Sequence, residues 1–133
     1  MIETESPYWG KAEESLAGAE SEFTNGRYNN CANRCYYSCF QAAVVALKRA
    51  GVRPRGASGQ WSHDFVPAQF DGLLIGRRKL YATDLRGVLA RNYGLRAAAD
   101  YEDASVSRAE AARALQRART FVGTIRARNS GSR

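Results

Sequence analysis

Residues 31–43 read CANRCYYSCFQAA, and this stretch sets an arginine and two tyrosines among three cysteines. On a helix, Cys31, Cys35 and Cys39 lie along one oblique stripe, because each step of four residues turns the helix by about 40°. Free cysteine is among the most buried residue types and packs as a small apolar side chain. The spacing therefore favours a helix that uses these thiols to fill a core.

A metal or redox site is the alternative interpretation of the same cysteines. Structural zinc takes four ligands, usually from turns, whereas this chain has three cysteines and one histidine, His63. An odd number of cysteines also fits reduced thiols better than a disulfide framework. We therefore predict no metal and no cofactor. With an acidic N-terminus, MIETESPYWG, in place of a basic signal peptide, the chain is expected to be cytoplasmic.

Helix-capping and turn-forming residues divide the chain into segments. Ser6-Pro7 predicts the start of a first helix and Asn25-Gly26 its end, and a second helix is expected over 27–50. The short turn between them predicts an antiparallel hairpin. The other expected elements are a basic loop at 51–60, a short helix from Ser62, a basic turn at 76–79, a helix over 80–101 with a possible bend at Gly94, and a last helix opened by a capping box at 107–110.

These segments predict an all-α protein, an up-and-down four-helix bundle with one short additional helix. A chain of 133 residues suits a single core. We expect one domain over residues 1–128 and a disordered basic tail over 129–133. No apolar run approaches the ~18 residues that a membrane helix needs, so no membrane partner is expected.

The charge of the chain is uneven along its length. Its net charge is +7, yet residues 1–30 hold six acidic and two basic side chains, so the remainder carries +11. A strongly basic body attracts polyanions through its summed field. Nucleic acid or an acidic protein is therefore an expected class of partner.

A second stripe lies beside the cysteines. Arg34, Tyr37 and Gln41 are spaced by three and four residues, so they share one helix face. A solvated face with arginine stacked on tyrosine explains this pattern without any function. A binding surface is the other interpretation.

Residues 33–43, NRCYYSCFQAA, carry the pattern Asn-Arg-x-Tyr-Tyr-x-x-Phe-x-Ala of a known family. Three later segments agree with that family in order and spacing. They are WSHDFVPAQF at 61–70, with histidine before phenylalanine; LRAAADYED at 95–103, with Arg-x-x-x-Asp-Tyr; and the Ala-rich AEAARALQRARTFVGTI at 109–125. Over roughly residues 8–125 the chain resembles the HEPN domain family.

The resemblance implies a helical bundle that forms a homodimer. Many members are metal-independent RNases, and many are paired with a minimal nucleotidyltransferase in toxin–antitoxin systems. Active members carry arginine, then four to six residues, then a histidine that moves a proton while the arginine stabilises phosphate charge. Here Arg96 stands at the arginine position, but Tyr101, Glu102 and Asp103 occupy the histidine positions. The usual RNase pair is therefore incomplete.

Three functions follow from these patterns. The first is a dimeric module of a toxin–antitoxin or defence system that binds RNA, a nucleotide or a partner protein. The second is an active RNase in which His63 replaces the missing histidine and acts with Arg96. The third is a structural protein whose acidic first helix and basic remainder drive self-assembly. The expected binding residues are Arg34, Tyr37, His63, Arg96, Asp100 and Tyr101.

Overall fold

The computed structural model describes residues 7–54, 59–101 and 105–131. The described chain is helical and has no strand, which confirms the predicted all-α class. Its elements are α1 (Pro7–Thr24), α2 (Tyr28–Arg49), α3 (Phe65–Gln69), the π-helix η2 (Phe70–Arg77), the 3-10 turn η3 (Thr83–Leu85), α4 (Val88–Tyr101) and α5 (Arg108–Gly131). No described helix has the length and apolar character needed to cross a membrane.

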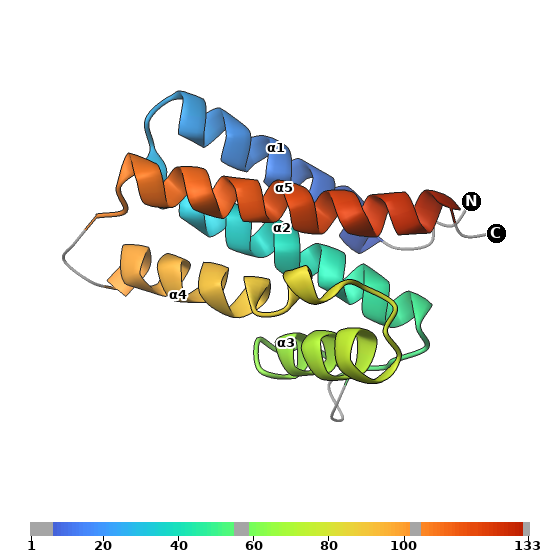
Figure 1. The fold of residues 1–133 in the computed structure, drawn as a ribbon. Helices are drawn as coiled ribbons and strands as arrows, with labels where there is room; N and C mark the ends of the chain where they lie inside the picture. Colours follow the sequence, from blue (N-terminus) through green and yellow to red (C-terminus); the bar gives the residue numbers. More distant parts are fainter. Residues whose placement is uncertain (1–6, 55–58, 102–104, 132–133) are drawn as a thin grey trace.

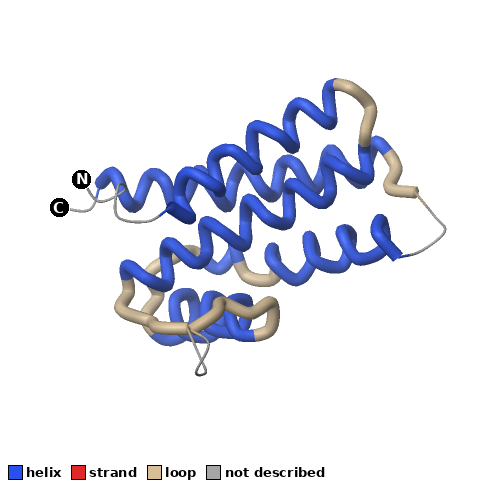
Figure 2. The backbone as a smooth tube through the Cα atoms, turned by 180° about the vertical axis from the view of Figure 1, so that it is seen from behind, coloured by secondary structure: helices blue, strands red, loops and turns tan. Residues whose placement is uncertain are grey.

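Helix α2 lies at the centre of the bundle and contacts α1, α3, α4 and α5. Helices α1 and α5 lie along one side of it, and α4 and α3 along the other (Figure 1). The view from behind shows the same arrangement (Figure 2). Gly26 has φ +76° in the turn between α1 and α2, so it supplies the left-handed end that the sequence predicts.

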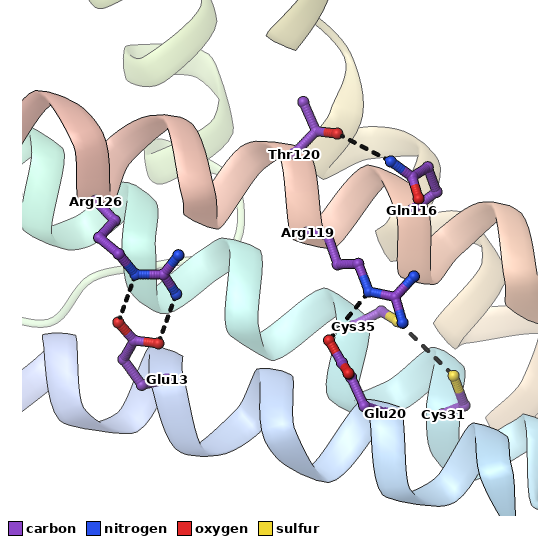
Figure 3. Close-up of polar contacts among 8 residues, drawn as sticks. All are labelled: Glu13, Glu20, Cys31, Cys35, Gln116, Arg119, Thr120 and Arg126. Carbon is purple, nitrogen blue, oxygen red and sulfur yellow. Dashed lines mark hydrogen bonds and ion pairs between the residues drawn. The ribbon is translucent and has the colours of Figure 1, made fainter.

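The three cysteines fill the core, as predicted. Cys31, Cys35 and Cys39 are 0% exposed, and the sulfurs of Cys31 and Cys35 lie 3.9 Å apart (Figure 3). Burial raises the pKa of Cys39 to about 12, so this thiol stays protonated at neutral pH. Within the described part of the chain, no three His, Cys, Asp or Glu side chains group as metal ligands.

Ion pairs join α1 to α5 across the bundle. Arg126 Nη2 lies 2.7 Å from Glu13 Oε1, and Arg119 Nε lies 3.0 Å from Glu20 Oε2 (Figure 3). Each pair is partly exposed, so each contributes only about 0–1 kcal/mol. Two carboxylates of the acidic first helix are therefore neutralised within the chain.

The helix predicted over 80–101 is shorter than expected, and this prediction is wrong in its first eight residues. Residues 80–87 form a loop with the turn η3, and α4 begins at Val88. Gly87 has φ +80°, which a helix does not allow, and its N–H donates to Asp71 Oδ2 at 3.1 Å. Helix α4 continues through Gly94 without interruption.

The remaining boundaries follow the capping chemistry in part. Ser62 Oγ accepts a hydrogen bond from the Phe65 N–H at 2.9 Å, but the helix that follows continues as η2 into the predicted basic turn. At the start of α5, Ser107 and Glu110 exchange hydrogen bonds of 2.9 and 3.1 Å, so the capping box is confirmed. Helix α5 continues to Gly131, within the segment predicted as a tail, and residues 132–133 lie outside the described chain.

Two glycine substitutions test this account of α4. Gly87→Ala should lower the free energy of unfolding by about 1–2 kcal/mol, because a side chain disfavours positive φ. Gly94→Ala should raise it by about 0.5–1 kcal/mol, because Gly94 is an exposed helix residue with no atom within 4 Å of an added Cβ. Urea unfolding measures both, and equal effects of the same sign would contradict the boundary at Val88.

Candidate functional site

An aromatic cluster forms where α2 faces α4. Tyr36 is 0% exposed, and its ring lies 5.1 Å from Tyr37, 5.9 Å from Phe40 and 5.4 Å from Tyr93 of α4. Tyr36 and Phe40 are four residues apart on α2, so they lie one above the other on the same face. Tyr93 is 42% exposed, which makes it the outer edge of the cluster.

The turn before α3 places His63 on this cluster. The imidazole centroid lies 4.9 Å from the Phe40 ring and 5.5 Å from the Tyr36 ring. His63 Nδ1 forms a hydrogen bond with the Tyr36 hydroxyl. The turn is held there by the Ser62 cap and by Val66, which is 0% exposed. A residue 27 positions after Tyr36 is thus fixed beside it.

The protonation states of this pair follow from burial and charge. Burial raises the pKa of Tyr36, so the phenol stays protonated. His63 is exposed overall, but partial desolvation of its ring and the Arg96 charge lower its pKa, and the Asp64 charge opposes them. A neutral imidazole accepts through one nitrogen and donates through the other. We therefore infer that Tyr36 donates to Nδ1 and that the His63 proton sits on Nε2.

Arg96 lies over the same rings from α4. Its guanidinium carbon is 5.4 Å from the Tyr37 centroid and 5.9 Å from both Tyr36 and Tyr93. The side chain is 16% exposed, and Nε lies 3.2 Å from Asp100 Oδ2 one helical turn on. The Nε–H is buried and makes no hydrogen bond to any described residue, because a hydrogen bond needs alignment as well as distance. Arg96 therefore holds its positive charge over these rings with a side chain that is largely shielded from solvent.

Arg34 reaches the edge of this site. Its guanidinium carbon lies 5.3 Å from the Tyr37 centroid, so Arg34 and Arg96 share one ring. Its Nε and Nη2 donate to Asn33 Oδ1 at 3.1 and 2.8 Å. An added Cβ on Gly18 of α1 would lie 3.5 Å from Arg34 Cδ, so the stem of Arg34 packs against α1. Arg34 is a peripheral cation and not the centre of the site.

The structure separates the other predicted residues from this cluster. Gln41 is the third member of the polar stripe. Its side-chain amide lies 2.9 Å from the hydroxyl oxygen of Ser15 on α1, so Gln41 contributes to the interface between α1 and α2. Tyr101 is 77% exposed at the end of α4 and shares no ring contact with the described site. Of the predicted binding residues, the structure brings together Tyr37, His63, Arg96 and Asp100, with Arg34 at the edge.

Three further residues, Tyr36, Phe40 and Tyr93, contribute to the site although they were not among the predicted binding residues. Tyr36 is the first tyrosine of the Asn-Arg-x-Tyr-Tyr-x-x-Phe pattern, and it directly follows Cys35 of the buried stripe. Tyr93 precedes Arg96 by three residues and so shares its face, a spacing that could have identified it. Phe40 belongs to the same pattern as Tyr36, four residues on.

Comparisons with known proteins agree with this architecture. The model of the HEPN domain family matches residues 7–128. A protein of Methanocaldococcus jannaschii, named "Putative toxin MJ0605", is 27% identical over 118 residues, which cover 86% of this chain and 81% of that protein. The match to the family model includes α1, α2, α4 and most of α5, and with them every residue of the site.

The single histidine of the chain gives a direct test of the site. Its imidazole should titrate below its usual pKa of 6.5. Arg96→Gln should move the midpoint up by removing a positive charge, and Asp64→Asn should move it down. Proton NMR of the one imidazole measures all three, and a midpoint unaffected by Arg96→Gln would separate the two residues.

The same shift predicts a pH dependence of stability. Below pH 6.5 the unfolded chain binds a proton at His63 before the folded chain does. The contribution of this group to stability is therefore complete above pH 6.5 and is lost as the pH falls toward the folded pKa. The histidine-free variant His63→Gln, unfolded in parallel, should lack this part of the pH dependence.

Proposed function

The chain belongs to the HEPN domain family, and from this premise we propose that it is a toxin-type module that binds RNA or a nucleotide at the Arg96–His63 site. The observation that supports the proposal is the place of Arg96, over three tyrosine rings and beside an imidazole. Guanidinium groups bind phosphate oxygens through paired N–H donors. A toxin-like relative is consistent with the proposal.

The chemistry of the neighbouring groups suits a phosphate ester. Neutral His63 offers an Nε2–H donor without adding charge, and Arg96 supplies the positive charge. The exposed Tyr93 ring provides a surface on which a base can stack. Asp100 competes with the ligand for Arg96, but at 32% exposure its ion pair is partly screened by water.

Cleavage of RNA is the second candidate, because His63 lies beside Arg96 although it comes 33 residues earlier in the chain. A neutral imidazole near pH 7 has the pKa range of a general base. However, its Nδ1 is engaged with Tyr36, so a base role at Nε2 requires the proton to move to Nδ1. The geometry therefore favours binding over catalysis.

Binding to a labelled single-stranded RNA of about a dozen nucleotides tests the first candidate. Arg96→Gln should weaken binding by about 10-fold or more, since a hydrogen bond to a charged group contributes about 1.5–3 kcal/mol. The matched control is Arg108→Gln, which removes the same charge from an arginine 5.1 Å over Phe23, outside the site. Equal affinity of both variants would contradict the proposal.

Incubation of the same RNA with the parent chain tests the second candidate. Cleavage by the parent that is lost in both His63→Ala and Arg96→Ala would support an RNase. Cleavage that survives in both variants would exclude this pair as its source.

Because HEPN domains commonly dimerise, we also propose that this chain forms a homodimer. We further propose that it acts in the cytoplasm and that a minimal nucleotidyltransferase is a partner protein. Self-assembly through an acidic first helix is the less favoured route, because Glu13 and Glu20 are already paired with arginines of α5. Association should therefore change little between about 0.05 and 0.5 M salt. Sedimentation equilibrium measures this, and a steep loss of dimer with salt would favour the electrostatic route.

A further inference from the structure

Three arginines gather on the side of the bundle where α4 faces α5. Arg117 of α5 donates its Nε–H to Asn92 Oδ1 of α4 at 2.8 Å. Asn92 is 0% exposed, and its Nδ2 lies 3.7 Å from Cys39 Sγ in the core. Arg117 is therefore anchored through one nitrogen, and its two Nη groups have no hydrogen bond to a described residue. We call Arg91, Arg113 and Arg117 the arginine patch.

The arginine patch carries an excess of positive charge. Burial lowers the pKa of Arg117, and the charges of Arg91 and Arg113 lower it further. Both neighbours are exposed, and neither forms an ion pair with any residue that the structure describes. Asp71 also interacts with Arg91, but its carboxylate accepts from the Gly87 N–H and interacts with Arg86 too. One carboxylate thus faces several guanidinium groups.

This arrangement differs from the arginines on the opposite side of α5. There, Arg119 and Arg126 are each paired with a glutamate of α1. Like charges that gather without counterions raise the free energy of the folded chain, and a polyanion removes that repulsion. The patch therefore has the properties of a phosphate-binding surface and not of a stabilising network.

The outer face of α4 connects the patch to the Arg96–His63 site. At about 100° per residue, Arg91 and Arg96 lie on different sides of α4, about 7.5 Å apart along its axis. The exposed surface between them holds Tyr93, Ala90 and Gly94. Small side chains let a ligand backbone approach closely, and the Tyr93 ring is 42% exposed and borders both His63 and Arg96.

We propose that the ligand is a strand of RNA whose backbone runs from the Arg96–His63 site across α4 to the arginine patch. This inference rests on the proposed function and narrows it, because a mononucleotide cannot reach both groups of cations. RNA fits better than an acidic peptide, since a stacking ring lies between the two sets of guanidinium groups. Arginine also matches phosphate through paired donors.

Two double variants test the proposal. Arg91→Gln/Arg113→Gln should weaken binding of a labelled 12-nucleotide oligouridylate by about 10-fold or more, while a dinucleotide binds as before. The slope of log affinity against log salt should fall by about 1.4, since two phosphate contacts are lost from a single strand. Arg119→Gln/Arg126→Gln is the matched control, because it removes two arginines that already have partners. It should change the affinity by less than about 3-fold.

The outcomes separate this inference from the proposed function. If the 12-mer binds both double variants equally but loses affinity with Arg96→Gln, the path across α4 is wrong and the Arg96 site stands. If the patch variants weaken binding and Arg96→Gln does not, the Arg96 site is wrong. Polyglutamate that binds the parent as tightly as the 12-mer would overturn RNA in favour of an acidic protein. Because all four substituted arginines are exposed, thermal melts should show both double variants folded.

Discussion

The burial of α2 on several sides is the constraint on which the rest of the structure depends. Where it passes α1 and α5, the helix presents the small side chains of Cys31 and Cys35, both 0% exposed (Figure 3). Toward α3 and α4 it presents the large rings of Tyr36 and Phe40. Protein interiors are packed as densely as organic crystals, so each face admits only neighbours of matching shape.

The packing of the large rings of α2 against α3 and α4 also positions the side chains of the candidate site. Tyr36 is buried by the packing of α2, and its hydroxyl lies at the edge of the core, where it forms a hydrogen bond with His63 Nδ1. The cost of burying a phenol is lower when its hydroxyl has a partner, so the packing of α2 and the position of the imidazole depend on each other. Desolvation in this cluster raises the pKa of Tyr36 and, together with the Arg96 charge, lowers the pKa of His63.

Charged side chains are also distributed differently on the two sides of α2. On the α1–α5 side, arginines form ion pairs with carboxylates, and each pair contributes little to the stability of the fold. On the α4 side, Arg96 rests on aromatic rings, and the arginine patch has a single carboxylate nearby. Unbalanced cations do not improve the stability of a fold, and ring faces compensate for only part of the missing counterions. The surface around α4 therefore carries the unpaired positive charge on which the proposed binding of an anionic ligand rests.

Local sequence patterns were enough for much of the fold. The α1–α2 hairpin, the capping box at Ser107 and the burial of the cysteines each depend on residues a few positions apart. Arg34 and Tyr37 were also identifiable from helical spacing, and Arg96 from the resemblance to the HEPN family. Periodicity and capping act over one or two helical turns, and such short-range effects are visible in the order of residues.

The tertiary structure decided what depends on contacts between distant segments. Gly87 ends the loop before α4, where its N–H donates to the carboxylate of Asp71, 16 residues earlier. The residues next to Gly87 do not predict that hydrogen bond. Gln41 forms a hydrogen bond with Ser15 of α1, and Arg117 forms one with Asn92, which lies 25 residues earlier in the chain. In the same way, His63 and Arg96 come from distant segments and lie against the same Tyr36 and Tyr93 rings. A sequence specifies which groups are available, but only the packing of whole helices sets which of them come within a few ångströms of each other, because hydrogen bonds and ring contacts act at that range alone.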